Sequence, residues 1–573
     1  MQNKFISTIC VSPNDTIREV LRKMGENDPA KTNLPAGIVV VTDRQRKVLG
    51  IVTNGDLRRG LSRDMMLDDS VSGVMNKNPF LIEGPISDRE MLSHAMDKIK
   101  QESWHADKLN KIIVVDKSKK LLELMSLYDI WHRSDTRFKH IGIVGLGYVG
   151  LTLGLTLANL GFKVKGLDAN PEIGKLLKKG KTHFYEAGLE TLLCDNYGIN
   201  FSAVSDFLGK NICDIYFITV GTPLGPDNKP NLSYLESAAR TVGGILKRGD
   251  SVILRSTVPM GSTRTVVIPI LEKESGLKAG EGFFVSFAPE RTIEGKALEE
   301  LRHLPQVIGG VNRASADAAA NIFNVMTHSI ITVESLEEAE MVKLVNNTYR
   351  DVTFAFANEV SLIAKKWGVD THRVIDAANY GYERARVPKP SPGVGGYCLE
   401  KDPYIFIDSA GKKGYIPLLF QNARAVSELM VNHVLSEIES FLKKEKKQAQ
   451  KTKIVILGFA FKGKPVTSDV RGSSTIKIVE HLQKKGYRNI HGFDPAVVKS
   501  DITRFGVSHV GDIKKGIRGA DVVLVMNNNP HFEELNIRPL LAVSKKPVLM
   551  FDTWGIYNEE EVKKAEGVIY NKL

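Results

Sequence analysis

The sequence has only four cysteines among 573 residues, and no two of them form a CxxC pair. Such sparse and scattered cysteines argue against a disulfide framework and against a cysteine-rich zinc site. We interpret Cys10, Cys194 and Cys213 as small, buried hydrophobic residues. Cys398 is a separate case because of the residues that surround it.

Long apolar runs are also absent. No stretch approaches the roughly 18 apolar residues that cross a bilayer. The first residues, MQNKFISTICVSPND, lack the basic and then apolar plan of a signal peptide. We therefore expect a cytoplasmic protein that does not insert into a membrane.

The chain carries a formal net charge of +12, which is compatible with nucleic acid, anionic lipid or small anionic ligands as partners. Part of the excess lies in KKEKKQAQKTK at residues 443–453, which we interpret as a solvated linker or helix end. Because the sequence contains no nucleic-acid-binding motif, we expect diphosphate ligands as partners and no nucleic acid. No pattern of metal ligands is present either, so we expect no metal.

The length is too great for one hydrophobic core, so we expect several domains. The pattern predicts an α/β protein, in which two Rossmann-like, doubly wound domains are joined by a helical central domain and preceded by a smaller α/β module. We place the four parts at residues 1–136, 137–334, 335–450 and 451–573.

Residues 1–136 contain two similar α/β units. Each ends in strand, turn, strand and helix, and Thr53-x-x-Asp56 in the first is matched by Ser126-x-x-Asp129 in the second. This internal repeat resembles a pair of CBS domains. The resemblance implies that these four residues hold the ribose and phosphate of a regulatory adenine nucleotide. The alternative is that both aspartates only cap the helices that follow them.

The two repeats differ at one position before the turn. The first repeat has Gly50 there, whereas the second has Glu123. A carboxylate near a phosphate repels it. We therefore expect the first repeat to be the better nucleotide site.

A glycine-rich turn begins the second part of the chain. Gly145-Leu-Gly-Tyr-Val-Gly150 follows the predicted strand HIGIV and opens a predicted helix, which is the context that a dinucleotide-binding motif requires. Free N–H groups and the helix dipole would favour the pyrophosphate there. Asp168, at the end of the next strand, would accept the ribose hydroxyls and repel a 2′-phosphate, which predicts NAD rather than NADP. The alternatives are a glycine turn without cofactor and an ordinary turn aspartate.

Residues from about Ser335 to Leu442 are predicted to be mostly helical. The segment EEAEMVKLVNNTYRDVTFAFANEVSLIAKKWG has apolar residues at helical spacing over many turns. We expect this long helix to form the spine of a homodimer or of a higher homo-oligomer.

The most informative segment is SPGVGGYCLEKD at residues 391–402. Glycines let a substrate approach the backbone closely. The neighbouring Lys401, together with a helix N-terminus, would favour the thiolate form of Cys398. A lone cysteine is usually structural, but in this setting Cys398 is predicted to be catalytic.

From Phe138 to its end the sequence resembles the UDP-glucose/GDP-mannose dehydrogenase family. The resemblance lies in ordered blocks: GLGYVG, VGTPLGPDNKPNLSYL, STVPMGST, APERTIEGKAL, EAEMVKLVNNTYR, PGVGGYCLEKDP and GFAFKGKPVTSDVRGSS. It implies an NAD-dependent, four-electron oxidation of the C6 hydroxyl of a nucleotide sugar to a carboxylate. Such a product would serve as a precursor of surface polysaccharide.

The resemblance also implies roles for individual residues. Cys398 is the nucleophile that carries a thiohemiacetal and then a thioester. Lys343 and Asn347, one helical turn apart, contact the reacting oxygen, and Asp402 orients a water or the lysine. The alternative, which the two residues in isolation favour, is that Lys343 and Asn347 are ordinary polar residues of an exposed helix face.

Hydrolysis of the thioester is assigned by the resemblance to a second group. Glu290 is the base, Thr257 positions the water and Glu294 is a supporting carboxylate. The alternatives are that Glu290 stands at a helix start, where the dipole favours it, and that Thr257 only ends a strand.

The binding residues follow from the same blocks. Those implied for the cofactor are Gly145, Gly147, Tyr148, Val149, Gly150, Asp168, Thr222, Ser256 and Thr257. Those implied for the substrate are Glu290, Arg291, Lys343, Asn347, Arg384, Gly395, Gly396, Lys462 and Arg471. The last two are cations suited to a diphosphate or a sugar, although they could also be ordinary surface cations.

The identity of the sugar is indicated by conflicting signals. APERTIEGKALEELRHLPQVIGG is similar to members that act on N-acetylated UDP-sugars such as UDP-GlcNAc or UDP-ManNAc, whereas CLEKD is typical of UDP-glucose and GDP-mannose enzymes. Arg384 matches an arginine that reaches the neighbouring subunit's sugar, but Arg386 competes for that position. Tyr397 departs from the usual histidine or serine. We expect a UDP-N-acetylhexosamine, with UDP-glucose as the alternative.

Two other classes of function remain. A two-electron, NAD-dependent hydroxyacid dehydrogenase would have a similar helical centre but would not need the nucleophile Cys398. A nucleotide-sensing protein that has lost catalysis would not need Lys343, Asn347 and Asp402, all of which are present.

Overall fold

The computed structural model describes residues 6–27, 34, 37–79, 81–84, 112–125, 140–327, 329–384 and 386–573. The chain forms two compact units, Met1–Lys139 and His140–Leu573. Ser126, Asp129 and the helix expected near residues 88–101 lie outside the described residues.

The first unit contains two three-stranded sheets of the same design. They consist of β1 (Cys10–Val11), β2 (Ile38–Thr42) and β3 (Val48–Thr53), and of β4 (Leu81–Glu83), β5 (Ile112–Val115) and β6 (Leu121–Met125). In each sheet the first pair of strands is parallel and the second pair is antiparallel with a bulge. Gly50 pairs with Val41, and Glu123 pairs with Val114, so these two residues occupy equivalent positions.

The two sheets of the first unit share a hydrophobic core. Ile38 and Val40 of β2 pack in one cluster with Ile113 and Leu124 of the second sheet. The opposite face of β2 is covered by α1 (Ile17–Glu26) and α3 (Asn54–Leu61). Both faces of β2 are buried, which explains why its sequence, IVVVT, does not alternate between apolar and polar residues.

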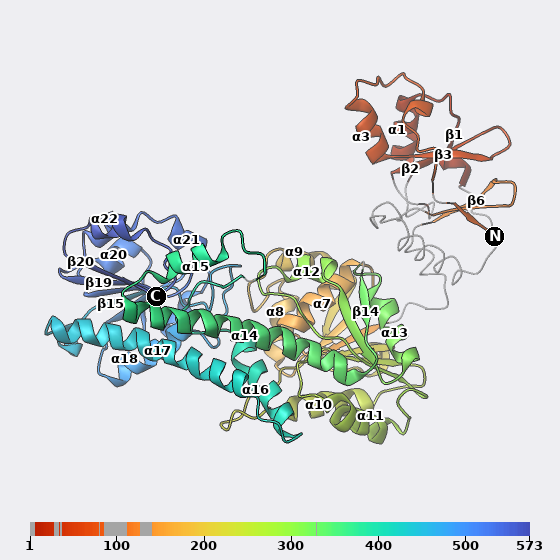
Figure 1. Ribbon diagram of the computed structural model, residues 1–573. Helices are drawn as coiled ribbons and strands as arrows, with labels where there is room; N and C mark the ends of the chain where they lie inside the picture. Colours follow the sequence, from red (N-terminus) through yellow and green to blue (C-terminus); the bar gives the residue numbers. More distant parts are fainter. Residues whose placement is uncertain are drawn as a thin grey trace. The chain divides into compact units, whose positions relative to one another are not determined.

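The second unit begins with an eight-stranded sheet in the order β14-β13-β12-β11-β10-β7-β8-β9, in which only β12 and β13 are antiparallel. Its strands are β7 (Ile141–Val144), β8 (Val164–Leu167), β9 (Phe201–Val204), β10 (Ile215–Ile218), β11 (Ser251–Leu254), β12 (Phe284–Phe287), β13 (Gln306–Gly310) and β14 (Ile330–Thr332). The helices between them are α7 (Tyr148–Asn159), α8 (Pro171–Lys178), α9 (Leu189–Asn196), α10 (Ser233–Gly243), α11 (Ile268–Ser275), α12 (Ala297–His303) and α13 (Arg313–Phe323). Figure 1 shows α7 and α9 on one side of this sheet and α10 with α11 on the other, which confirms the predicted doubly wound fold.

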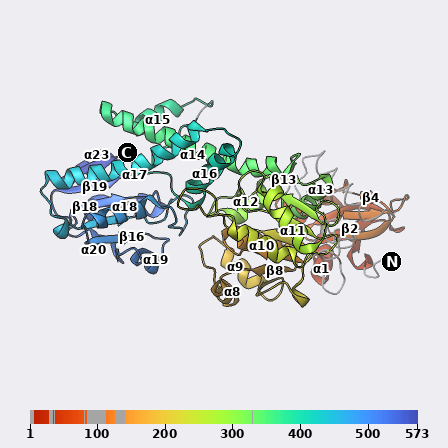
Figure 2. The same ribbon diagram turned by 90° about the horizontal axis from the view of Figure 1, so that it is seen from below.

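Four helices follow: α14 (Leu336–Trp367), α15 (Thr371–Asn379), α16 (Tyr397–Gly411) and α17 (Leu418–Lys444). The predicted long helix is confirmed as α14. Ser335 caps its start by accepting the N–H of Glu338, and Gly368 ends it with a φ of 67°. Helices α14 and α17 lie side by side in both views (Figures 1 and 2).

The chain ends in a six-stranded parallel sheet in the order β17-β16-β15-β18-β19-β20. Its strands are β15 (Ile454–Leu457), β16 (Ile490–Phe493), β17 (Ser508–His509), β18 (Val522–Val525), β19 (Val548–Asp552) and β20 (Val568–Lys572). Its helices are α18 (Ser474–Lys484), α19 (Lys499–Thr503), α20 (Ile513–Ile517), α21 (Pro530–Glu533), α22 (Ile537–Leu541) and α23 (Glu559–Lys563). The lysine-rich run at residues 443–453 begins in the last turn of α17, which agrees with its interpretation as a helix end.

One expectation about the cysteines is wrong. Cys213 is buried, but Cys194 is exposed and Cys10 is partly buried. Cys194 lies on α9, whose core-facing side is formed by Leu189 and Leu193 instead. Among the described residues, no helix has the length and apolar character needed to cross a membrane.

Candidate active site

The glycine-rich turn connects β7 to α7. Gly145 has a φ of 95°, and a Cβ at Gly150 would lie 1.9 Å from the Gly145 carbonyl oxygen, so both positions need glycine. A Cβ at Gly147 would meet nothing within 4 Å. Gly147 also begins α7 without a side-chain cap, which leaves the first N–H groups of the helix without a side-chain acceptor. The open space at this helix start fits the pyrophosphate of a dinucleotide.

The other residues predicted for the cofactor lie at the same edge of the sheet. Asp168 follows β8 and accepts the N–H of Leu146 at 2.7 Å, which ties it to the glycine-rich turn. Thr222, after β10, donates its hydroxyl to the Thr257 carbonyl oxygen at 2.5 Å. Ser256 is buried beside β10. The turn role considered for Asp168 is therefore present and is compatible with cofactor binding. The alternative that Thr257 only ends a strand is wrong, because β11 ends at Leu254.

Tyr148 connects the glycine-rich turn to a distant loop. Its hydroxyl donates to the carboxylate of Glu186 at 2.5 Å, and that carboxylate also accepts the N–H groups of Gly295 at 2.7 Å and Ala297 at 2.9 Å. Burial, together with Glu186, raises the pKa of Tyr148 above its usual value. The sequence had not indicated Glu186, because nothing near it resembles a motif.

Cys398 is the second residue of α16. The preceding glycines are needed for packing, since a Cβ at Gly396 would lie 2.6 Å from the Phe461 ring and one at Gly395 would lie 2.7 Å from the Gly472 carbonyl oxygen. The two glycines therefore dock the cysteine loop against the C-terminal sheet domain.

Cys398 is exposed as a residue, but the groups packed around its sulfur desolvate the thiol. This desolvation raises the pKa of Cys398, and Asp402 adds to the effect, whereas Lys343 and Lys401 oppose it without cancelling it. The thiol is therefore mostly protonated at neutral pH, and its attack on an aldehyde requires a group that takes the proton.

A buried polar cluster lies on the adjoining helices. Lys343 and Asn347 of α14 are each only 7% exposed, so the alternative of an exposed helix face is wrong. The Asn347 side chain donates to Asp402 at 2.5 Å, and Lys401 pairs with the other oxygen of Asp402 at 2.5 Å. Asp402 therefore orients Asn347 directly.

Glu290 is held in a buried ion pair. Arg255, which is fully buried, donates two hydrogen bonds to one Glu290 oxygen at 2.7 and 3.0 Å. The other oxygen accepts the N–H groups of Arg291 and Thr292 at 2.7 and 2.8 Å. Burial by itself would raise the pKa of Glu290, but the Arg255 guanidinium, the N–H of Thr292 and Lys343 together outweigh it and lower the pKa. The residue lies in a loop before α12, so it does not stand at a helix start.

Arg255 was not predicted from the sequence, although it holds the Glu290 loop in place through its hydrogen bonds. It also donates to the Ala288 carbonyl oxygen at 3.1 Å and to the Gln306 side chain at 3.0 Å, and its guanidinium lies 5.2 Å from the centre of the Phe323 ring. Only its position directly before Ser256 could have drawn attention to it.

We expect Arg255→Met to lower the free energy of unfolding by about 3–5 kcal/mol, because it leaves the Glu290 carboxylate buried without its cation. Arg255→Met combined with Glu290→Leu should recover much of that loss but no activity. Denaturant unfolding measures both effects. Arg313→Met, which breaks an exposed pair with Asp317, is the matched control and should change stability by about 1 kcal/mol or less. An equal loss in Arg255→Met and Arg313→Met would contradict the assignment.

Glu294 lies among the cations of the C-terminal domain. Lys462 donates to the Glu294 carbonyl oxygen at 2.9 Å, and Arg471 lies 3.9 Å from its carboxylate. Burial, followed by the nearby Asp469, raises the pKa of Glu294 to about 7. Burial likewise lowers the pKa of Lys462 to about 8. Glu294 and the Cys398 thiol are close enough to influence each other electrostatically.

Two further arginines were predicted for the substrate. Arg291 is partly buried and donates to the Pro305 carbonyl oxygen. Arg384 is exposed and packs against the Tyr382 ring at 5.1 Å, so this chain by itself does not bring it to the other site residues.

In the first unit, Thr53 caps α3 and Asp56 completes the capping box. One Asp56 oxygen accepts the N–H of Thr53 at 2.9 Å and its hydroxyl at 2.7 Å, and the other accepts from Arg59 at 2.6 Å. The capping role considered for Asp56 is therefore present.

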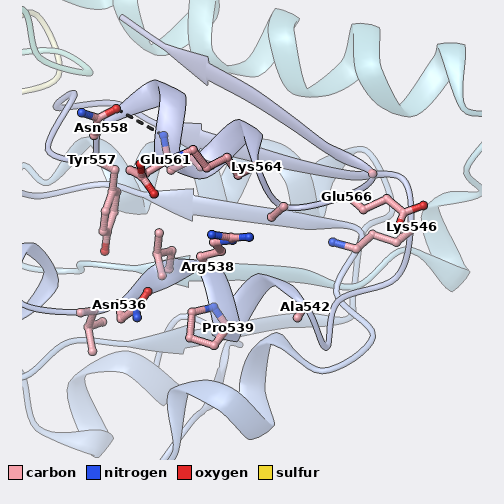
Figure 3. A pocket seen from close by; sticks show the side chains of 15 residues that line it. Asn536, Arg538, Pro539, Ala542, Lys546, Tyr557, Asn558, Glu561, Lys564 and Glu566 are labelled. Atoms are coloured by element: carbon pink, nitrogen blue, oxygen red, sulfur yellow. Dashed lines mark hydrogen bonds and ion pairs between the residues drawn. The ribbon is translucent and has the colours of Figure 1, made fainter.

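A hollow of about 390 Å³ lies beside the buried polar cluster of Asn347 and Asp402. It is lined by residues of α16, α17 and α18, including Tyr397 and Lys401. A larger groove of about 1070 Å³ lies between α22 and α23, and Figure 3 shows Arg538 and Lys546 on its walls. None of the residues predicted for the site lines this second groove.

Comparisons with known proteins show the family of the chain. Three models of the UDP-glucose/GDP-mannose dehydrogenase family match the chain: the NAD binding domain at residues 139–327, the central domain at 337–428 and the UDP binding domain at 455–559. A CBS domain model matches residues 4–63.

Relatives match along nearly their whole length. UDP-N-acetyl-D-mannosamine dehydrogenase of Pyrococcus horikoshii is 34% identical over 426 residues, which are 74% of this chain and 97% of the relative. A solved structure of UDP-D-ManNAc dehydrogenase from Pyrococcus horikoshii has 31% identity and a TM-score of 0.68, and the match covers 76% of this chain and 98% of that one. UDP-glucose dehydrogenase from Pyrobaculum islandicum has 30% identity and a TM-score of 0.66, with coverage of 76% and 97%.

Proposed function

Because the chain belongs to the UDP-glucose/GDP-mannose dehydrogenase family, we propose that it oxidises the C6 hydroxyl of a UDP-N-acetylhexosamine to a carboxylate through Cys398. The protein is an NAD-dependent nucleotide-sugar dehydrogenase. The observation that carries the proposed mechanism is the buried cluster of Lys343, Asn347 and Asp402, which lies beside the only cysteine in the glycine-rich loop.

NAD supplies the acceptor for the hydride of each oxidation. In the first oxidation, the C6 hydroxyl gives its proton to a water near Asp402, and the Lys343 ammonium, which lies close to Glu290 and Cys398, stabilises the alkoxide that forms. Asn347, oriented by Asp402, donates a hydrogen bond to the same oxygen. We therefore propose that the lysine stabilises the charge of the reacting oxygen and that the asparagine directs a hydrogen bond to it.

Cys398 keeps the aldehyde bound. Its sulfur forms a bond to C6 while the thiol proton passes to the aldehyde oxygen, which gives a thiohemiacetal. The second oxidation removes a hydride from C6 and the hydroxyl proton to solvent, which leaves a thioester. Water then attacks C6 and gives a proton to a base, and the C6–sulfur bond breaks. The Cys398 thiolate leaves and takes up a proton, and the sugar is released as a carboxylate. Covalent capture explains how one site completes both oxidations without releasing the aldehyde.

Two carboxylates compete for the role of the base in hydrolysis. Glu290, the residue assigned from the resemblance, has a lowered pKa and already accepts four hydrogen bonds. Glu294 has a pKa of about 7 and a single hydrogen bond to its carboxylate, from Thr467 at 3.3 Å. A base works best when its pKa lies near the working pH. We therefore assign the proton transfer to Glu294 and the placement of the loop to Glu290.

The choice of sugar rests on the relatives and on one block of sequence. UDP-N-acetyl-D-mannosamine dehydrogenases are among the relatives, and the solved UDP-glucose dehydrogenase represents the alternative. The test is NADH production with a panel of UDP-ManNAc, UDP-GlcNAc, UDP-GalNAc, UDP-glucose and GDP-mannose. We expect the highest kcat/KM with an N-acetylated UDP-sugar, and a preference for UDP-glucose would overturn this choice.

We also propose that the protein is a homodimer and that α14 forms its interface. The exposed apolar side chains of this helix recur at intervals of four and seven residues, which places them on one stripe: Met341, Val345, Tyr349, Phe356, Ile363 and Trp367. Tyr349 is 69% exposed and Trp367 is 81% exposed, so the stripe is open in the single chain.

Phe356→Glu should shift the protein from dimer toward monomer, because it places a charge in the middle of that stripe. Sedimentation velocity measures the shift. Tyr234→Glu, at an equally exposed aromatic on α10, is the control and should leave the mass unchanged. A wild-type monomer at micromolar concentration would refute the proposal.

We further propose that an adenine nucleotide binds at Thr53 and Asp56 and changes the rate of the dehydrogenase. Binding requires the Arg59 side chain to release Asp56, which is feasible because Arg59 is 65% exposed. A nucleotide at about 100 times its Kd should add about 2.7 kcal/mol to the stability of the unit that binds it. We expect ATP, ADP or AMP to raise Tm, and Asp56→Ala to abolish the increase while Asp43→Ala keeps it. No change in Tm or in rate with any of the three would end this proposal.

A further inference from the structure

Tyr397 stands immediately before the nucleophile and lies between two cations. The Arg471 guanidinium carbon is 4.8 Å from the centre of its ring, and the Lys401 ammonium is 5.3 Å from it. Cations at these distances are attracted to the face of an aromatic ring. The tyrosine therefore connects the helix of Cys398 to Arg471, which comes from the C-terminal domain.

Arg471 is prepared to bind an anion. Its guanidinium pairs with Asp469 at 2.6 Å and lies 3.9 Å from Glu294, while its side chain remains 55% exposed. An arginine fixed in this way can offer its free N–H groups to a diphosphate or a sugar. The Tyr397 ring limits the directions that this guanidinium can take.

The hydroxyl of Tyr397 reaches a different domain. A Cβ added at Gly221 would lie 3.3 Å from the Tyr397 hydroxyl oxygen, so the glycine leaves just enough room for it. Gly221 follows β10 and precedes Thr222, whose hydroxyl is bonded to the Thr257 carbonyl. One side chain thus contacts the diphosphate side and the cofactor side of the site.

We propose that Tyr397 is a positioning residue that links the binding of the nucleotide sugar to the binding of NAD. The proposal rests on the proposed function. A UDP group that engages Arg471 fixes the ring through the cation–ring contact, and the fixed hydroxyl supports the Gly221 segment in the position that the cofactor needs. Because such a link is reciprocal, each ligand then binds more tightly in the presence of the other.

Two substitutions distinguish the role of the Tyr397 ring from the role of its hydroxyl. Tyr397→Leu removes the ring, and we expect it to raise the Kd for UDP and the KM for the UDP-sugar about threefold to thirtyfold. Tyr397→Phe keeps the ring and removes the hydroxyl. It should leave the Kd for UDP nearly unchanged and abolish the effect of UDP on the Kd for NAD. Calorimetric titrations of the full-length protein with UDP, with NAD and with NAD after UDP provide these values.

A double substitution tests the contact at Gly221. Gly221→Ala should weaken NAD binding, because its methyl group crowds the tyrosine hydroxyl. Tyr397→Phe should relieve that crowding, so the double variant should bind NAD as well as Tyr397→Phe does. This recovery would show that the Tyr397 hydroxyl contacts the Gly221 segment, and the loss of the effect of UDP on NAD binding in Tyr397→Phe separates a link between the ligands from a purely structural role.

The proposal is wrong if Tyr397→Leu binds UDP as tightly as the wild type, or if the wild type shows no coupling between UDP and NAD. It is also wrong if the effects of Gly221→Ala and Tyr397→Phe on NAD binding simply add. Failure of the proposed function gives a different result: no UDP-sugar yields NADH, although UDP binding still responds to Tyr397→Leu.

Discussion

Cys398→Ala should lower the rate of carboxylate formation at least about 10³-fold, since loss of a catalytic nucleophile costs still larger factors in other enzymes. Without sulfur at this position, the aldehyde of the first oxidation has no covalent partner and cannot become a thioester. Binding of NAD and of the UDP-sugar should persist, because the glycine-rich turn and the cations Lys462 and Arg471 are unchanged. Formation of the uronic acid, measured by chromatography, reports the loss.

Cys194→Ala is the matched control for this experiment. Cys194 is an exposed free cysteine on α9, in a part of the chain that has no role in the proposed chemistry. We expect Cys194→Ala to keep the wild-type rate. If Cys398→Ala retained a tenth or more of the wild-type rate, Cys398 would not be the nucleophile.

Glu294→Gln should lower the steady-state rate by about 10²–10⁴-fold and cause the thioester to accumulate. Both oxidations precede the step that needs the base, so mixing enzyme with substrate should release a rapid burst of two NADH per active site. Mass spectrometry of the acid-quenched protein should then find the sugar nucleotide on the peptide that contains Cys398. Glutamine keeps the size of the side chain and removes its ability to accept the proton.

The pH dependence gives a second test of this carboxylate. A base must be ionised to act, and the ionised fraction of Glu294 increases as the pH rises through its pKa of about 7. The hydrolysis rate of the wild type should therefore rise across that range and level off above it. The rise should be absent in Glu294→Gln.

Glu290→Gln distinguishes the two carboxylates. It weakens the ion pair with Arg255, so we expect a lower Tm together with reduced activity, but without an accumulated thioester. If Glu290→Gln accumulated the thioester and Glu294→Gln did not, the original assignment of the base to Glu290 would hold.

Patterns within short segments allowed much of the fold and of the site to be predicted. The strand, glycine turn and helix around Gly145 are encoded by neighbouring residues, because each glycine answers a local steric need. The spacing of Lys343 and Asn347 placed them on one helix face, and the structure adds that this face is buried against α16. Helical periodicity predicts such a face without saying which neighbour covers it.

Contacts between distant segments could not be predicted in the same way. Arg255 and Glu290 are 35 residues apart, and Tyr148 and Glu186 are 38 apart. Such pairs depend on which strands become neighbours, and single charged residues carry no signal of that pairing. The pKa of Cys398 was misjudged for a similar reason: Lys401 is close in sequence, but the desolvation that outweighs its effect comes from the folded surroundings.

The number of NADH molecules formed for each UDP-sugar consumed tests the central claim most directly. Capture of the aldehyde by the thiol of residue 398 requires two successive oxidations at one site before any product leaves. Complete conversion of a limiting amount of substrate should therefore yield two NADH per sugar. A yield of one, with a free aldehyde or ketone as the product, would contradict the account and identify a simple two-electron dehydrogenase.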